Sequence, residues 1–442
     1  MERRRNGLII FLFTLLVVTT SSCMDDVVTK ENQIKNEFNI ASMKESDSST
    51  LSIEEVKEIA SNFFRKADVK NGLRSSTKEI SISMMYTVKA LDSINLYAFN
   101  RENGGFVLIN PIKRSSSRII AYSDVDNFSE EMLNSTPFLI WKDYIMDCIL
   151  NQDIALSGND VKSRANSLTL RAYPRWVEDI LKTKVGDLTP EKEKELVDYL
   201  RKEILITYPL IKTSFHQGSP YNDDCPNGCP AGCVAISVGQ VVNYYRKWDG
   251  GNWNFNKINS STTPDISKYI YAIGRGLKMI YKHDGSYPDW GNLNFITDLN
   301  YREVSFLKDI GYWAKSYTVS SNSSRLIEEL SSIKHPVIMN GYKKQFVVPY
   351  DGHSWIADGI KTRKSTYIMN KQQARDIGFI FSDQLKYEDL PVRYLLYEET
   401  NYFLHFNMGW ADSNNTWYLY IGDVAEHNFK YKHHIKFIII KK

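Results

Sequence analysis

Hydrophobic residues in the first third of the chain follow two different periods. After Ser52-Ile-Glu-Glu55, which has the form of a capping box, apolar residues recur close to every 3.6 positions and predict a helix. Strand-like runs come next, with a hairpin signal at Asn103-Gly104-Gly105, and a second helical pattern follows. The predicted strands cover residues 80–88, 95–100, 105–110 and 118–123, and the second helix covers residues 136–150. This order predicts a small α+β unit over residues 51–156.

The pattern changes twice in the rest of the chain. Residues 157–207 are mixed and polar, and we interpret them as a linker or helical connector. Within them, Thr189 and Pro190 start a helix with an apolar stripe of Leu196, Val197, Leu200 and Ile204. Beyond Leu210, loops, aromatic residues and short strands predominate around one helical pattern at residues 233–245. Its apolar face carries Val234, Val238, Val241, Val242 and Tyr245, whereas Gln240 and Asn243 lie off that face.

The first residues have the organisation of an export signal. Three arginines precede an apolar run from Leu8 to Val18, which is too short to span a bilayer, and small residues then lead into Cys23. Small residues followed by cysteine resemble the bacterial lipobox. We therefore expect a lipoprotein signal peptide at residues 1–22, a lipid anchor at Cys23 and a tether at residues 23–50. The expected location is the outer membrane or cell surface of a Gram-negative bacterium, with release after processing as a second possibility.

Composition narrows the class of function. The chain has 442 residues, 24% of them charged, and a net charge of +3, which is too small to favour nucleic acid or a membrane surface. It contains no zinc-finger spacing, Walker loop or dinucleotide fingerprint. We therefore expect no nucleic-acid partner, cofactor or metal.

Cys233 is the first candidate for chemistry. Gly232 and Cys233 follow a turn-rich loop and open the helix predicted at residues 233–245, where the helix dipole and backbone N–H groups favour a thiolate. A structural core cysteine is the alternative interpretation. Cys225 and Cys229 leave two possibilities open, a small disulfide loop or a metal site that includes Cys233. The four-residue spacing fits neither common zinc pairs nor iron–sulfur runs. Cys148 is predicted to be a buried helix residue.

His353 is the preferred candidate for a base. It lies in Asp351-Gly-His-Ser-Trp-Ile-Ala-Asp-Gly359, an apolar strand bracketed by glycines. His405 is predicted to be a strand histidine with its own hydrogen-bond partner. The other six histidines lie near the C-terminus or in poorly patterned segments.

Three ordered motifs resemble the streptopain-like cysteine peptidases. They are the segment from Tyr208 through Gln217 to Gly232-Cys233-Val-Ala235, the histidine motif Gly352–Gly359, and His405-Phe-Asn407-Met-Gly409-Trp410. The segment Leu96–Asn127 resembles the inhibitory prodomain of that family. The resemblance implies an α+β fold with a papain-like peptidase domain at residues 208–442, formed by a helical half and an antiparallel β half. It also implies protein or peptide substrates and a prodomain at residues 51–156 that inhibits the peptidase within the same chain.

The resemblance also assigns roles. Cys233 would be the nucleophile and His353 the general base. Gln217 would form an oxyanion hole with the Cys233 backbone N–H. Asn407 and Trp410 fall where papain-like enzymes orient or shield the histidine.

The sequence departs from the family pattern in the third motif. Met408 stands where a tryptophan is expected, and residues 361–397 lengthen the interval between His353 and Asn407 as an inserted strand pair or flap. These departures leave two alternatives to an exported endopeptidase zymogen. One is a weak or inactive peptidase-fold binding protein, and the other is a papain-like acyltransferase.

Overall fold

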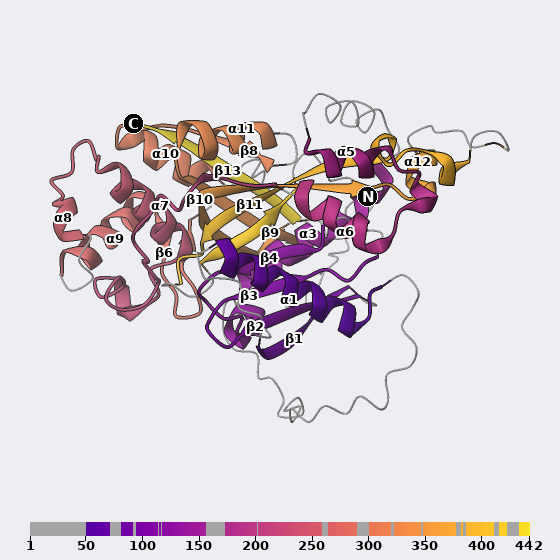
Figure 1. The fold of residues 1–442 in the computed structure, drawn as a ribbon. Coiled ribbons are helices and arrows are strands. Elements are labelled where there is room, and N and C mark those ends of the chain that lie inside the picture. Colours follow the sequence, from indigo (N-terminus) through magenta and orange to yellow (C-terminus); the bar gives the residue numbers. More distant parts are fainter. Residues whose placement is uncertain are drawn as a thin grey trace, which may run out of the picture.

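One large antiparallel sheet organises the computed structural model of the protein (Figure 1). Ten of its eleven strands join in the order β1-β2-β3-β4-β12-β11-β10-β9-β13-β8, and the eleventh, β5, pairs with β10 beside this path. The structure describes residues 50–70, 81–91, 94–155 except 114 and 116, 173–258 except 201, 264–289, 300–345 except 320 and 321, 348–376, 382, 386–410, 415–421 and 433–442. The expected signal peptide, the anchor at Cys23 and nearly all of the tether lie outside these residues.

The first four strands and their helices form a unit over residues 50–155, which is called the inhibitor unit below after the prodomain that its sequence resembles. The elements are α1 (Ile53–Lys70), β1 (Ile82–Leu91), β2 (Ile94–Arg101), β3 (Phe106–Ile109), β4 (Ile119–Ser123), α2 (Glu130–Asn134) and α3 (Thr136–Ala155). The predicted capping box is confirmed, because Glu55 Oε2 accepts from Ser52 N at 2.7 Å and Ser52 Oγ accepts from Glu55 N at 3.2 Å. The predicted strands and the helix containing buried Cys148 are confirmed as well.

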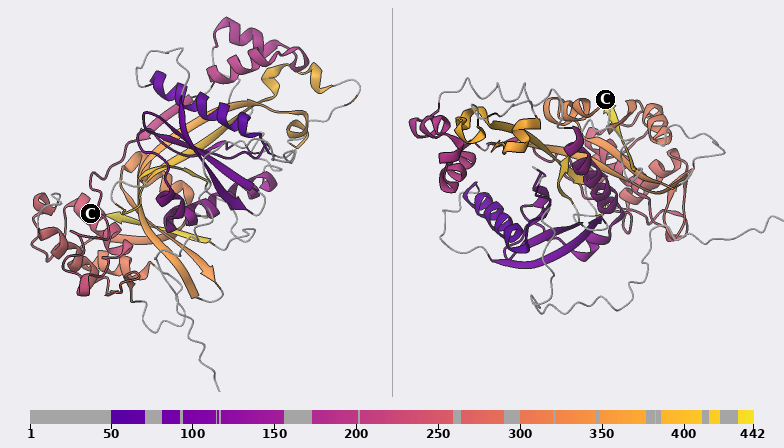
Figure 2. Two further views of the ribbon diagram at one scale, coloured as in Figure 1. Left: turned by 90° about the horizontal axis from the view of Figure 1, so that it is seen from below. Right: turned by 90° about the vertical axis from the view of Figure 1, so that its right-hand side faces the viewer.

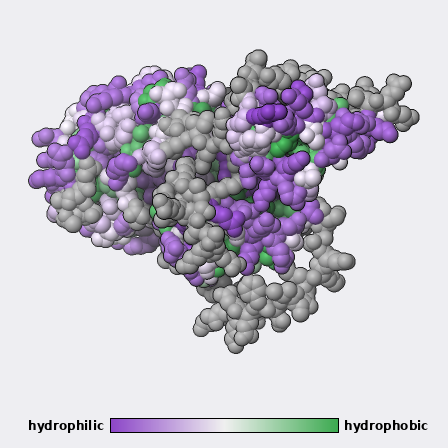
Figure 3. All heavy atoms as spheres, in the orientation of Figure 1, coloured by the Kyte–Doolittle hydropathy of each residue, from purple (hydrophilic) through white to green (hydrophobic). Residues whose placement is uncertain are grey.

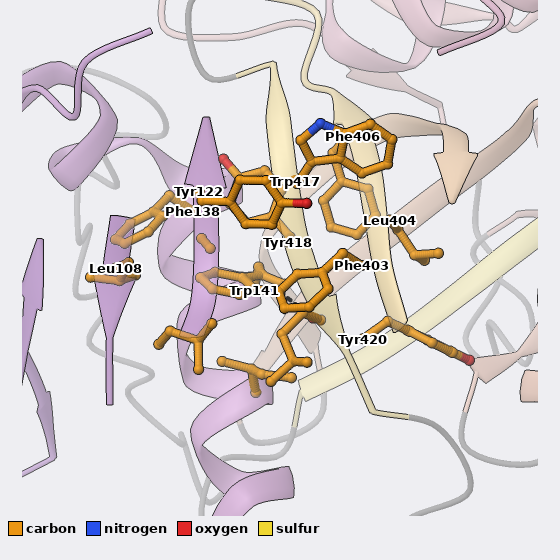
Figure 4. Packing of buried hydrophobic residues seen from close by; sticks show 14 of the residues in the cluster. Leu108, Tyr122, Phe138, Trp141, Phe403, Leu404, Phe406, Trp417, Tyr418 and Tyr420 are labelled. Carbon is orange, nitrogen blue, oxygen red and sulfur yellow. Dashed lines mark hydrogen bonds between the residues drawn. The ribbon is translucent and has the colours of Figure 1, made fainter. Parts of the chain in front are cut away.

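The inhibitor unit shares one hydrophobic core with the following domain (Figure 4). Trp141 and Tyr418 pack edge to face with ring centroids 4.7 Å apart, and Tyr122 meets Phe403 in the same way at 5.4 Å. The indole of Trp141 is also satisfied, since its Nε1 donates to Leu419 O at 3.1 Å. The contact therefore has the character of a domain interior.

Strand pairing also joins the inhibitor unit to the second domain. β4 pairs with β12 (Thr416–Tyr420) through Tyr122 opposite Trp417 and Ala121 opposite Tyr418. Thr416 Oγ1 also donates to Tyr122 O. The backbone of the inhibitor unit is thus an extension of the sheet of the second domain.

The second domain has a helical half and a β half, which lie on different sides of the molecule in Figures 1 and 2. The helical half contains η5 (Pro226–Gly228), α7 (Cys233–Tyr245), α8 (Phe255–Ile258), α9 (Asp265–Gly276), β6 (Met279–Ile280), β7 (Tyr287–Pro288) and α10 (Tyr301–Asp309). The β half contains β8 (Trp313–Thr318), α11 (Ser323–Glu328), η7 (Glu329–Ile333), β9 (Val337–Gln345), β10 (Val348–Ile368), β11 (Leu396–Asn407), β12 and β13 (His433–Lys441). This organisation confirms the predicted α+β class, with a helical half and an antiparallel β half preceded by a small α+β unit.

The predicted connector is folded where the structure describes it. Its elements are α5 (Arg175–Lys182), η4 (Val185–Asp187), α6 (Pro190–Leu200) and β5 (Lys202–Thr207). Their apolar side chains pack on Val392 and Leu396 of the long insertion, which also contains α12 (Lys371–Asp376), η8 (Tyr387–Asp389) and η9 (Val392–Tyr394). The expected helical stripe through Ile204 is wrong, because the helix ends at Leu200 and Ile204 pairs with Thr362 in the sheet.

The distribution of apolar residues over the described surface follows from this packing. On the face in Figure 3, hydrophilic residues predominate over the helical half, and hydrophobic residues occur in separate small areas. No helix among the described residues combines the length and apolar character needed to cross a bilayer.

Candidate active site

Cys233 is the first residue of α7 and is half-buried. The N-cap, Gly232, has φ +87° and no side chain to cap the helix, so the first N–H groups of α7 receive no cap from it. A Cβ at Gly232 would lie 2.7 Å from Ser286 O and would collide with the Met279 side chain. The sequence therefore needs glycine here, because the hairpin of β6 and β7 packs closely beside the start of α7.

Gln217 is held next to the start of this helix. Its carbonyl accepts from Ala231 N at 2.9 Å, two residues before Cys233. The side chain is half-buried and has no hydrogen-bond partner among the described residues. Its amide is therefore available to a ligand.

His353 lies on β10, and its imidazole contacts the third motif. Nε2 is 2.9 Å from Met408 O, and because a carbonyl can only accept, Nε2 carries the hydrogen and Nδ1 carries the lone pair. The residue is only 5% exposed. Burial lowers the pKa of His353 to about 4, although the hydrogen bond with Met408 opposes this shift. The imidazole is therefore neutral at neutral pH.

Trp410 covers the same histidine. Its Nε1 lies 3.4 Å from His353 Nε2, and the two ring centroids are 6.2 Å apart. The backbone of Trp410 forms an isolated bridge with His216, the neighbour of Gln217. The structure thus joins the third motif to both the histidine and the predicted oxyanion segment.

Asn407 is buried but does not orient His353 directly. Its Nδ2 donates to Thr213 O at 3.0 Å and its Oδ1 accepts from Gln240 Nε2 at 3.1 Å. The Met408 backbone carbonyl provides the contact with the imidazole instead, and a role of Asn407 in the reaction stays a prediction. This also explains why methionine is tolerated here, since any residue supplies a carbonyl.

α7 and β10 contact each other close to Cys233 and His353 in the sequence. Ser237 Oγ and Ser354 Oγ are 2.6 Å apart and fully buried. Ser237 is one turn after Cys233, and Ser354 follows His353. Neighbouring strand residues point to opposite faces, and the His353 ring is stacked with Trp355, 6.4 Å between centroids.

The face of β10 that carries Trp355 is the one packed against the inhibitor unit. α3 contacts β10 and β9, and Trp355 and Ile140 both approach Gly341. Within the described part of the chain, His353 Nε2 donates to Met408 O, and the Trp410 indole lies beside the ring. The imidazole is therefore engaged by the third motif.

The burial of the polar residues inside α7 is not predicted by the sequence pattern. Gln240 was expected off the buried face, but it is completely buried, because α7 packs between α9 and the strands β9 and β10. The available signal was a glutamine, a serine and an asparagine inside an otherwise apolar helix. His405 was predicted correctly, since its Nδ1 lies 2.7 Å from Asp358 Oδ1 on the neighbouring strand.

Cys225 and Cys229 are buried thiols, and the structure contains no disulfide between them. Burial raises the pKa of Cys225 to about 11, which keeps that thiol protonated. Within the described ranges, no group of three histidine, cysteine or acidic side chains could hold a metal ion.

Family models match two separate parts of the chain. Residues 48–148 match the Spi protease inhibitor family, and residues 252–418 match the Peptidase C10 family. The second match includes His353, Asn407 and Trp410 and begins after Gln217 and Cys233. No curated protein sequence matches the chain significantly.

Two solved structures are similar over large parts of their length. A fragment of Prevotella intermedia prointerpain A has 14% identity, covers 80% of this chain and 98% of its own, and gives a TM-score of 0.44. Active wild-type interpain A cysteine protease from Prevotella intermedia has 16% identity, covers 53% and 94%, and gives 0.34. Since residues 48–148 match a Spi protease inhibitor and residues 252–418 match the Peptidase C10 family of streptopain-like cysteine peptidases, the chain carries an inhibitor unit ahead of a cysteine peptidase unit.

Proposed function

We propose that the protein is an exported cysteine endopeptidase in which Cys233 is the nucleophile and His353 the general base. The observation that carries this assignment is the arrangement of Cys233 at an uncapped helix start, beside Gln217 and one turn from the contact between α7 and the strand of His353. Export by a signal peptide and attachment through Cys23 belong to the same proposal and rest on the sequence alone.

The residues support thiol acylation of a peptide bond. Nδ1 of His353 takes the proton of Cys233, and the sulfur attacks the substrate carbonyl carbon. The Cys233 N–H and the Gln217 amide donate to the resulting oxyanion. The imidazolium then protonates the leaving amine, and water deprotonated by His353 hydrolyses the thioester, which restores the thiol.

The docked inhibitor unit prevents the first of these reaction steps. The imidazole of the full chain is buried and neutral, and α3 covers the face of β10 that His353 shares with Trp355. We infer that the thiol and imidazole form their ion pair after the inhibitor unit has been displaced or cut.

The test is labelling with an epoxide inhibitor directed at reactive thiols. The purified full chain should label slowly, whereas the same protein after limited proteolysis should label rapidly at Cys233 and degrade an unfolded protein substrate. Equal labelling before and after maturation would contradict autoinhibition. Transfer of the acyl group to an added amine in place of water would identify an acyltransferase instead.

Lys361 should help to hold the inhibitor unit in place. Its Nζ lies 4.1 Å from the Trp417 ring centroid and 4.9 Å from that of Tyr122, and it reaches Asp124 Oδ2 at 3.4 Å. Asp124 is partly exposed, so we assign most of the effect to the aromatic contacts. Lys361→Met keeps the apolar stem and should speed maturation about fivefold, equivalent to ~1 kcal/mol.

The measurement is the time course of conversion on a gel at fixed protease concentration. Lys364→Met is the matched control, because Lys364 lies three residues further along β10 and is not part of this aromatic cluster. Equal rates for the two variants would show that Lys361 does not hold the inhibitor unit.

A further inference from the structure

Gln240 and Asn407 form a buried pair of amides between α7 and the end of β11. Gln240 Nε2 donates to Asn407 Oδ1 at 3.1 Å, and Asn407 Nδ2 donates back to Gln240 Oε1 at 3.2 Å. Gln240 is completely buried and Asn407 is 3% exposed. Each side chain therefore satisfies the other in a position where an unpaired amide would be costly.

The pair also connects the predicted oxyanion segment to the site. Gln240 Oε1 accepts from Thr213 Oγ1 at 3.2 Å and from Phe215 N at 3.3 Å. Asn407 Nδ2 donates to Thr213 O. The segment that leads to Gln217 is thus fixed against α7 and the third motif by the same two side chains.

The backbone that follows Asn407 is fixed in the same place. Gly409 N donates to Asn407 Oδ1 at 3.2 Å, and Met408 N donates to Asn415 Oδ1 at 2.9 Å. Gly409 has φ +71°, and a Cβ added to it would lie 3.1 Å from Ile236 Cγ2 on α7. These contacts set the direction of the Met408 carbonyl, which holds His353 Nε2–H.

Gln240 lies seven residues after Cys233, two turns along the same helix face. We propose that Gln240 is a positioning residue for the peptidase reaction, which acts through Asn407 to fix the Met408 carbonyl, and hence His353, relative to Cys233. The inference rests on the proposed function. A displacement of about 1 Å in such a site can reduce turnover by about 100-fold.

The test compares matured enzymes with single and paired substitutions. Gln240→Leu removes every hydrogen bond of the amide and should lower kcat about 10- to 100-fold with little change in KM, because the substrate contacts are untouched. Gln240→Glu keeps the acceptor for Phe215 and Thr213 but loses the donor to Asn407, so it should cause a smaller loss. It also supplies the measurement if the leucine variant does not fold.

Exchange of the two side chains provides a rescue. In Gln240→Asn with Asn407→Gln, the pair keeps its combined length and its donors and acceptors, so the double variant should be more active than either single variant. Asn300→Leu is the control for loss of a buried amide, since Asn300 is fully buried and bonds to Ser316 and Asn340. It should lower thermal stability without a change in kcat at low temperature.

The possible failures are distinct. If the matured wild-type protein has no peptidase activity, the proposed function is wrong. If the wild type is active but the Gln240 variants match Asn300→Leu in kcat, or the exchange gives no rescue, Gln240 has only a structural role and the inference is wrong. A change confined to KM would also overturn it.

Discussion

Cys233→Ala should abolish peptide hydrolysis in the matured protein, by about 10⁴-fold or more. The side chain supplies the atom that becomes acylated, and neither the oxyanion donors nor His353 can replace it. The fold should be retained, because Cys233 is half-buried and alanine is well tolerated at the start of a helix. Turnover of an unfolded protein substrate and epoxide labelling are the two measurements.

Cys229→Ala is the matched control for this substitution. Cys229 is a buried thiol four residues before Cys233 and contributes no group to the proposed reaction. Its variant should keep both turnover and labelling. Unchanged turnover in Cys233→Ala would show that the nucleophile has been misassigned.

Acid should lower the free energy of unfolding of the full chain through the titration of His353. The pKa of this residue is about 4 in the folded protein, and an unfolded chain returns it to about 6.5. Between these values the unfolded chain binds a proton that the folded chain does not. The free energy of unfolding should therefore fall as pH decreases from 6.5 to 4, by about 3 kcal/mol, and His353 should contribute no slope above pH 6.5.

The measurement is denaturant unfolding of the full chain at pH 7 and pH 4.5, in a Cys233→Ala background that prevents self-digestion. Addition of His353→Gln removes the titrating group and should reduce the loss of stability between the two pH values. Equal losses in the presence and absence of His353 would contradict the burial of a neutral imidazole. Since the proposed active pair contains an imidazolium, the same titration favours displacement of the inhibitor in acid.

Local patterns were sufficient for the elements that depend on neighbouring residues. The capping box at Ser52, the hairpin at Asn103–Gly105 and the helix that starts at Cys233 are each specified within a few positions. Ile204 shows where such reasoning fails. Its strand forms against Thr362, more than 150 residues away, and no local period reports that partner.

The candidate site also combines residues that local motifs predict with contacts that they do not predict. Cys233, His353 and Gln217 could be proposed from residue type and motif order, and these assignments remain predictions. The support of the histidine could not be predicted, because it comes from a backbone carbonyl at Met408, which every residue type provides. The burial of Gln240 was not predicted, because a helical pattern gives only the average direction of the apolar residues. It does not show whether a second layer of structure covers the opposite face of the helix.

The β4–β12 pairing has a consequence for the enzyme after its inhibitor has left. Removal of the first four strands would convert β12 from an interior strand into an edge, with open backbone donors and acceptors beside Trp417 and Tyr418. Such an edge can recruit other extended chains, including unfolded protein. Lys361 would then remain as a charge above Trp417. Lys361, which helps to hold the inhibitor unit in the zymogen, would then oppose aggregation of the mature enzyme.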